Sequence, residues 1–296
     1  MTASALKSCL LAARPKTLPA AIVPVWVGCV LAWKLGGVFH AALAFATVAG
    51  AVAIQIATNF FNDAIDAQKG ADTERRLGPV RVTASGMMRP RVVMTLAAVF
   101  LLLALVCGVF LYHARGWPIV VIGIPSLFLA YGYTGGPFPL AYRGMGELFV
   151  ILFFGLIAVT GTVFIQTGNC PSAAVLLGFQ IGLLSAVLIS INNLRDREED
   201  STTGKRTLAV RFGRNVAVAV IILEIGIAVL VGVGWIWLGN ASWIYAGIPA
   251  LLIGIRIIHG VLTLPPGPVY NRLLALGGVQ MILFAAAFHA IALIFP

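Results

Sequence analysis

The chain has 296 residues, of which 60% are hydrophobic and 10% charged, and its mean hydropathy is +1.00. A soluble domain carries about a quarter charged residues, so this composition excludes a soluble globular protein and predicts a polytopic membrane protein. The net charge of +10 at pH 7 does not predict a nucleic-acid partner. The basic residues fall between apolar runs, where they meet the anionic headgroups of a lipid bilayer.

Apolar runs of about 17–25 residues cross the hydrocarbon core of a membrane as helices, because each must pair its own backbone groups there. The sequence predicts an all-α bundle of nine transmembrane helices that forms one domain over residues 1–296. The predicted spans are 18–34, 39–62, 92–112, 117–134, 146–167, 173–193, 216–238, 243–261 and 273–295.

The distribution of basic residues predicts the orientation of the chain. With the N-terminus in the cytoplasm, only Lys34 and Arg115 of the 20 Lys and Arg residues lie on the outer side. Cytoplasmic loops carry the excess of Lys and Arg, so we expect a cytoplasmic N-terminus. The sequence leaves the oligomeric state open.

Polar residues gather at the end of the second predicted span, in the stretch 55–72. On a helix that turns by about 100° per residue, five of them fall within one narrow sector: Gln55, Asn59, Asn62, Asp63 and Asp66. Such a stripe is costly in a membrane helix unless it faces a wet or ligand-filled interior. The stripe therefore predicts a functional site.

A second polar stretch, 192–208, follows the sixth predicted span. Ser185, Asn192, Asp196 and Asp200 share one helical face, and an even number of spans separates them from the first stretch, so both lie on the cytoplasmic side. Carboxylate and amide oxygens suit Mg²⁺ rather than zinc or copper. We expect the two helix ends to face each other and to form a magnesium site.

Basic residues near both stretches can bind phosphate groups through charge-assisted hydrogen bonds. They are Arg75, Arg76, Arg81, Arg195, Lys205 and Arg206. The alternative interpretation is that the charges are solvated loop residues whose acids pair with neighbouring bases. A surface loop, however, has no need of an amide stripe that runs into the bilayer.

Several motifs resemble those of a known family. NxxNDxxD at Asn59–Asp66 and NNLRDxxxD at Asn192–Asp200 are similar to the two Asp-rich motifs of the UbiA-type intramembrane prenyltransferases. Other segments resemble the 1,4-dihydroxy-2-naphthoate polyprenyltransferases of menaquinone synthesis. They are RPKTLPA at 14–20, GPVR at 78–81, YTGGPFPLAY at 133–142, GELFVILFFG at 146–155 and GKRTLAVRFG at 204–213.

The resemblance implies Mg²⁺-dependent transfer of a polyprenyl group from a prenyl diphosphate to an aromatic acceptor. The implied acceptor is 1,4-dihydroxy-2-naphthoate and the product demethylmenaquinol, made in a bacterial plasma (inner) membrane. Two Mg²⁺ ions would bridge the diphosphate. One would be held by Asn59, Asp63 and Asp66 with help from Asp72, and the other by Asn192, Asp196 and Asp200.

Within this interpretation the catalytic carboxylates are Asp63, Asp66, Asp196 and Asp200. The expected substrate-binding residues are Arg14, Lys16, Asn62, Arg75, Arg76, Arg81, Tyr133, Tyr142, Glu147, Arg195, Lys205 and Arg206. Some of these have a structural alternative. The tyrosines can belong to an interfacial belt, Arg14 and Lys16 can be snorkelling anchors, and Glu147 can be an acid that the helix dipole favours at an N-terminus.

Two rival functions remain at this point. The first is the same fold acting on another aromatic acceptor, such as homogentisate or 4-hydroxybenzoate. The second is a membrane transporter, since polar groups inside a membrane also mark transport routes. Transporter sites lie near the bilayer midplane, whereas both acidic stretches here lie at one surface.

Overall fold

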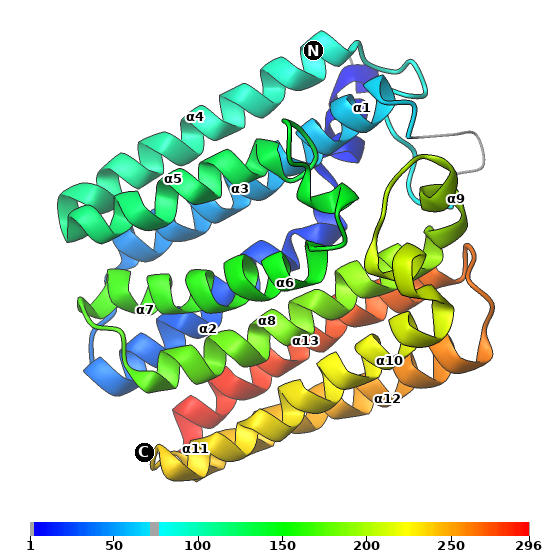
Figure 1. The fold of residues 1–296 in the computed structure, drawn as a ribbon. Coiled ribbons are helices and arrows are strands. Elements are labelled where there is room, and N and C mark those ends of the chain that lie inside the picture. The colour runs from blue at the N-terminus through cyan, green and yellow to red at the C-terminus, as the bar shows by residue number, and fades with distance from the viewer. Residues whose placement is uncertain (1–2, 72–76, 296) are drawn as a thin grey trace.

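The computed structural model describes residues 3–71 and 77–295, and within them the chain is helical and has no strand (Figure 1). The α-helices are α1 (Ala3–Ala13), α2 (Pro19–Gly36), α3 (Ala41–Gln68), α4 (Pro90–Arg115), α5 (Trp117–Gly132), α6 (Gly146–Val150), α7 (Ala158–Thr167), α8 (Ser172–Arg195), α9 (Arg197–Thr202), α10 (Leu208–Leu230), α11 (Gly234–Trp237), α12 (Gly247–Thr263) and α13 (Tyr270–Ile294). Shorter helical turns are η1 (Pro15–Thr17), η2 (Leu140–Tyr142), η3 (Ile151–Ile157), η4 (Val231–Val233) and η5 (Ala241–Ala246).

The predicted transmembrane architecture is confirmed. Over the described residues, eight helical segments are long and apolar enough to cross a membrane, and α5 is a shorter apolar helix. Three of the eight are continuous runs of smaller elements, 146–167, 208–237 and 241–263. These eight segments and α5 correspond to the nine predicted spans.

The ends of two spans differ from the prediction. Helix α3 continues to Gln68, six residues beyond the predicted end, because its polar residues face the protein interior. Helix α10 begins at Leu208, with Thr207 as its N-cap, and is kinked at Gly213 (φ 82°). The short helices α1 and α9 were not predicted, since neither carries the long apolar run on which the prediction depended.

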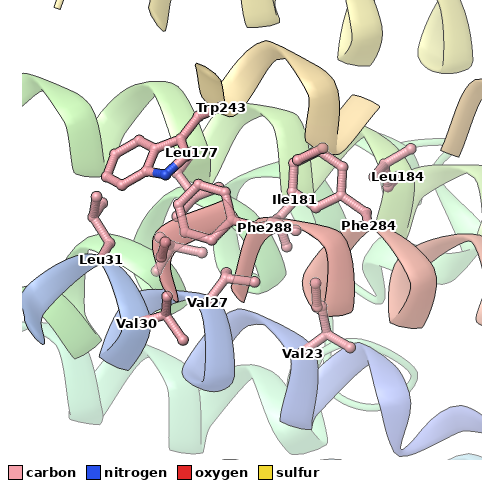
Figure 2. Packing of buried hydrophobic residues seen from close by; sticks show 14 of the residues in the cluster. Val23, Val27, Val30, Leu31, Leu177, Ile181, Leu184, Trp243, Phe284 and Phe288 are labelled. Carbon is pink, nitrogen blue, oxygen red and sulfur yellow. The ribbon is translucent and has the colours of Figure 1, made fainter. Parts of the chain in front are cut away.

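The main hydrophobic core lies between α2, α8, α13 and η5. Figure 2 shows Val27 and Leu31 of α2 against Ile181 of α8 and Phe288 of α13, with Trp243 of η5 beside them. The apolar window of α8 is 72% buried, whereas that of α4 is 17% buried. Helix α8 is therefore the centre of the bundle, and α4 lies at its periphery.

Helix α8, which leads into the second polar stretch, packs backbone against backbone with η3. Gly155 of the π-helical turn η3 lies so close to α8 that a Cβ atom there would be 2.3 Å from the Cα of Gly182. Only glycine permits this approach. The crossing fixes the position of α6 and η3 against the helix that carries Asn192 and Asp196.

The two ends of the bundle differ in character. Helices α1 and α9 and the loop before α4 lie at one end, while α11 and the C-terminus lie at the opposite end (Figure 1). The polar residues that conclude α3 and α8 both lie at the end of the bundle that carries α1 and α9.

Candidate active site

A cavity of about 1390 Å³ separates α3, α4 and α5 from α8 and α13. At one end it is lined by polar residues of both Asp-rich stretches, namely Asn59, Asn62, Asp66, Asn192, Asp196 and Asp200. The same cavity extends past Phe149, Phe153 and Ile157 to Leu111, Trp117 and Ile165 near the other end of the bundle. The cavity thus combines an acidic end with a long apolar chamber.

The acidic end is organised around Asp66, which is 2% exposed. Its Oδ2 accepts from Arg81 Nη2 at 3.1 Å and from Lys205 Nζ at 2.9 Å, and its Oδ1 accepts from the Tyr142 hydroxyl at 2.9 Å. Lys205 lies 139 positions further along the chain. The two Asp-rich stretches therefore meet at Asp66. This contact agrees with the expectation from the sequence that the two helix ends face each other.

The two amides of the first stretch make different contacts. The Asn59 amide nitrogen donates to the carbonyl of Ala13 at 2.9 Å and to Thr17 Oγ1 at 3.0 Å, which ties α3 to the segment before α2. The Asn62 Oδ1 accepts from the Thr134 hydroxyl. Both side chains line the cavity.

Asp63 has a different environment from the other predicted carboxylates. It is 1% exposed and is not among the residues that line the cavity. Its two oxygens accept from the backbone N–H groups of Val82 and Thr83, at 3.1 and 2.8 Å. Asp63 therefore holds the loop that carries Arg81, and its predicted role as a metal ligand stays a prediction.

The second stretch is held by a buried ion pair. Arg195 donates from Nε and Nη2 to the two oxygens of Asp196, at 2.7 and 2.6 Å. The same guanidinium also donates to Asn192 Oδ1 at 2.9 Å and to Asn271 Oδ1 at 2.7 Å. Arg195 thus fixes the polar end of α8 against the start of α13.

Asp200 on α9 is buried and close to other acids. The pKa of its carboxyl is raised from the usual 3.8 to about 7, chiefly by burial; the charge of Lys205 lowers it, and those of Asp196, Glu199 and Asp66 contribute to the rise. Several carboxylates therefore repel one another across the polar end of the cavity, and a bound cation would relieve this repulsion.

The oxygen donors at the polar end of the cavity fit an Mg²⁺ ion that is also bound by a substrate phosphate. Over residues 3–71 and 77–295, no three His, Cys, Asp or Glu side chains form a group that could hold a metal ion alone. Mg²⁺ keeps several waters and typically binds through one or two carboxylates together with substrate phosphates. Asp66, Asp196 and Asp200, together with amides that include Asn59 and Asn192, suit an ion whose coordination is completed by a diphosphate.

The remaining predicted residues are placed as follows. Arg14, Lys16, Arg81, Tyr133, Arg195 and Lys205 line the cavity. Tyr142 contacts Asp66 but is not a lining residue, and neither Glu147 nor the exposed Arg206 lines the cavity. Asp72, Arg75 and Arg76 lie outside the described residues.

Sequence reasoning missed three residues that support the site: Thr17, Thr134 and Asn271. Each makes a hydrogen bond to a predicted residue from an element distant in sequence, Thr17 to Asn59, Thr134 to Asn62 and Asn271 to Arg195. Polar residues just outside an apolar run are common, so the sequence carries no signal that distinguishes these three.

The fold and the cavity define an integral membrane protein whose acidic end can bind a polar headgroup and whose chamber can hold an apolar chain. A model of the UbiA prenyltransferase family matches residues 21–265. This match spans most of the helical bundle, so the chain belongs to the UbiA prenyltransferase family.

Two relatives indicate the branch of the family. The chain is 35% identical over 236 residues to the 1,4-dihydroxy-2-naphthoate octaprenyltransferase of Bacillus subtilis, covering 78% of this chain and 75% of that protein. It is 34% identical over 280 residues to the protein of the same name from Mycobacterium leprae, covering 93% of this chain and 92% of that protein.

Solved structures share the fold. An apo UbiA homologue from Aeropyrum pernix K1 superposes with a TM-score of 0.72 at 16% identity, over 93% of this chain and 97% of the other. A UbiA homologue from Archaeoglobus fulgidus bound to DMAPP and Mg²⁺ gives 0.65 at 16% identity, over 97% and 100%.

Proposed function

We propose that this protein transfers a polyprenyl group from a prenyl diphosphate to 1,4-dihydroxy-2-naphthoate, as one domain over residues 1–296. The observation that carries the proposal is the single cavity in which Asp66, Asp196 and Asp200 line one end and an apolar chamber continues from it. The acidic end suits a metal-bound diphosphate and the chamber suits an isoprenoid chain. The acceptor is inferred from the two relatives, both of which are named 1,4-dihydroxy-2-naphthoate octaprenyltransferase.

Binding of the diphosphate would change the hydrogen bonds of the two basic side chains that contact Asp66. Arg81 and Lys205 both donate to the same carboxylate oxygen, Asp66 Oδ2. A diphosphate offers more oxygens and more charge, so both side chains can donate to it as charge develops on the leaving group. Two bound Mg²⁺ ions, held by Asp66 with Asn59 and by Asp196 and Asp200 with Asn192, would supply Lewis-acid stabilisation of that leaving group.

The transfer breaks the allylic C–O bond and forms a C–C bond to an electron-rich ring carbon. Positive charge develops on the prenyl carbon, and the Tyr133 ring on the cavity wall can stabilise it through its face. Loss of the carboxyl group as CO₂, or of a proton, then restores the aromatic ring. The apolar lining keeps water away from the reactive carbon and so prevents simple hydrolysis.

The acceptor requires an anion site of its own. Arg14 and Lys16 line the cavity at its polar end and can bind the carboxylate of the naphthoate. We propose that this end faces the cytoplasm of a bacterium, in its plasma (inner) membrane, because nearly all basic residues lie on that side.

The test is a product assay on the purified full chain in lipid nanodiscs. Prenyl diphosphates of several lengths would be supplied with Mg²⁺ and with 1,4-dihydroxy-2-naphthoate, homogentisate or 4-hydroxybenzoate, and products would be identified by mass spectrometry. We expect pyrophosphate release and prenylation of the naphthoate with loss of CO₂. Prenylation of another acceptor alone would replace the proposed substrate, and absence of pyrophosphate release would favour a transporter.

A further inference from the structure

A buried polar cluster joins three helices behind the wall of the cavity. Asn193 on α8 donates from Nδ2 to Glu147 Oε1 on α6 at 2.8 Å. Ser190, one turn earlier on α8, donates to Glu224 Oε1 on α10 at 2.9 Å. Residues three apart on a helix share a face, so one face of α8 contacts both acids. We refer to Glu147 and Glu224 as the carboxyl pair.

The carboxyl pair is buried and lacks a counter-ion. Glu147 is 7% exposed and Glu224 is 4% exposed. Over the residues that the structure describes, no salt bridge involves either side chain, and the second oxygen of each carboxyl, Oε2, has no hydrogen-bond partner. Two ionised carboxylates in such a place would carry a desolvation cost that one hydrogen bond to each offsets only in part.

The two acids act on each other. Glu147 lies within electrostatic reach of Glu224, and both acids bond to neighbouring positions of α8, where like charges disfavour double ionisation. A single proton held by the pair removes one of the two charges and supplies the donor that the unpaired oxygens lack. This arrangement satisfies both acids without a cation.

The position of the pair relative to the active site gives it a role. Asn193 adjoins Asn192 in sequence, and both line the cavity. On the other side, Gly146, which precedes Glu147, lies against the Tyr133 hydroxyl, which would be 3.0 Å from a Cβ atom at that glycine. Tyr133 is also within electrostatic reach of Glu147, Asp66 and Asp200. Glu147 therefore contacts the second polar stretch at Asn193 and Glu224 contacts α8 just before it at Ser190, and neither acid lines the cavity.

We propose that Glu147 and Glu224 hold one proton between them, and that this pair fixes the rotation of the α8 end that carries Asn192 and Asp196. Glu147 and Glu224 are then positioning residues that act through Asn193 and Ser190. The sharing of the proton is independent of the proposed function, whereas the effect on the Asn192–Asp196 end is measured through it.

The first test is infrared spectroscopy of the purified full chain without substrate. The spectrum is recorded well above the pKa of Asp200, which is about 7, so that this acid is ionised. We expect the C=O stretching band of a buried carboxylic acid, sensitive to deuterium, which is lost in Glu224→Gln and in the double variant with Glu147→Gln. No such band in the original protein, or a band that survives in the double variant, would overturn the shared proton.

The second test measures the Mg²⁺ concentration that gives half-maximal pyrophosphate release. Glu224→Ala should raise this concentration about tenfold, the usual effect of removing a group that orients a metal ligand, with a smaller change in kcat. Glu224→Gln keeps an acceptor for the Ser190 hydroxyl. Its Mg²⁺ concentration for half-maximal release should therefore equal that of the original protein. If Glu224→Ala does not fold, Ser190→Ala, which removes the same hydrogen bond between α8 and Glu224, is measured in its place and should show the same rise.

Gln180→Ala provides the matched control. Gln180 is a buried polar residue on the same helix, but it hydrogen-bonds Trp235 and the Ala228 carbonyl, away from the polar end. Its loss should lower stability and leave the Mg²⁺ requirement unchanged. Equal shifts in Gln180→Ala and Glu224→Ala would overturn the positioning role. A protein that releases no pyrophosphate at all would contradict the proposed function, and the infrared result would still stand for the pair.

Discussion

At the scale of single residues, the predicted carboxylates divide by what they contact. Asp66 and Asp200 line the cavity and lie near Lys205, whereas Asp63 accepts the backbone N–H groups of a loop. Their spacing in the sequence is equally suggestive of metal binding for all three. The difference depends on where the loop 77–89 folds, which the sequence does not encode in any local pattern.

Replacement of Asp66 tests the centre of the site. Asp66→Asn keeps the shape of the side chain but removes the charge that binds Arg81 and Lys205 and that is proposed to bind a metal ion. We expect kcat to fall by about 100-fold or more, the range for loss of one preorganised electrostatic group. The matched control is Glu198→Gln, an exposed acid of the second stretch, which should retain activity. A variant at Asp66 with nearly full turnover would contradict its place in the reaction.

The pH dependence of metal binding follows from Asp200. Its folded-state pKa of about 7 is above the usual 3.8, so the stability that its protonated form contributes is lost as the pH rises through about 7. A metal ion requires the ionised form. The Mg²⁺ concentration for half-maximal activity should therefore rise as the pH falls below 7. Asp200→Asn should remove this dependence, and an unchanged profile in that variant would assign the titration to another group.

At the scale of elements, the apolar runs predicted the spans, but the contacts between them depend on small residues. The helix of α6, η3 and α7 meets α8 through Gly155, Gly178 and Gly182. Hydropathy identifies both helices and gives no information about which face of one meets the other. The same limit explains why Glu147 was expected to bind substrate: its neighbours on α8 and α10 become known only when the helices are packed.

The glycine crossing can be tested directly. Gly155→Ala places a Cβ atom 2.3 Å from the Cα of Gly182, so one helix has to move. We expect a loss of about 2 kcal/mol, within the range for overpacked interiors, seen as a lower unfolding temperature in nanodiscs. Gly226→Ala on α10, where nothing lies within 4 Å of the added atom, is the control and should be neutral. Equal stability of the two variants would contradict the close crossing.

At the scale of the whole molecule, the sequence predicted that two distant stretches meet, and it predicted their common side of the membrane. The contact of Lys205 with Asp66 agrees with that meeting. The size of the chamber was not predictable, because it is defined by residues from α3, α4, α5, α7, α8 and α13 that show no common motif. We therefore expect the preference for a prenyl chain length to depend on the size of this chamber.

Filling the far part of the chamber should change that preference. Gly108 on α4 lines the cavity and has no atom within 4 Å of a Cβ position, so Gly108→Phe can be accommodated while it occupies the chamber. We expect kcat/KM to fall for long prenyl diphosphates and to hold for short ones. Val106→Phe, at an exposed position of the same helix, should leave kcat/KM for long prenyl diphosphates unchanged relative to kcat/KM for short ones. An equal loss at all lengths would mean that the prenyl chain does not extend to α4.

Side chains that line the cavity and are also exposed include Leu105, Val109, Tyr112, Trp117, Ile124, Val279 and Ile282. Acyl tails of the surrounding bilayer can therefore reach the place where an isoprenoid is expected to lie. Every affinity measured for a prenyl diphosphate is then a competition against the alkyl chains of the medium. Detergents of different tail length should yield different apparent KM values for the same enzyme, and values from one solubilising agent cannot be carried over to another.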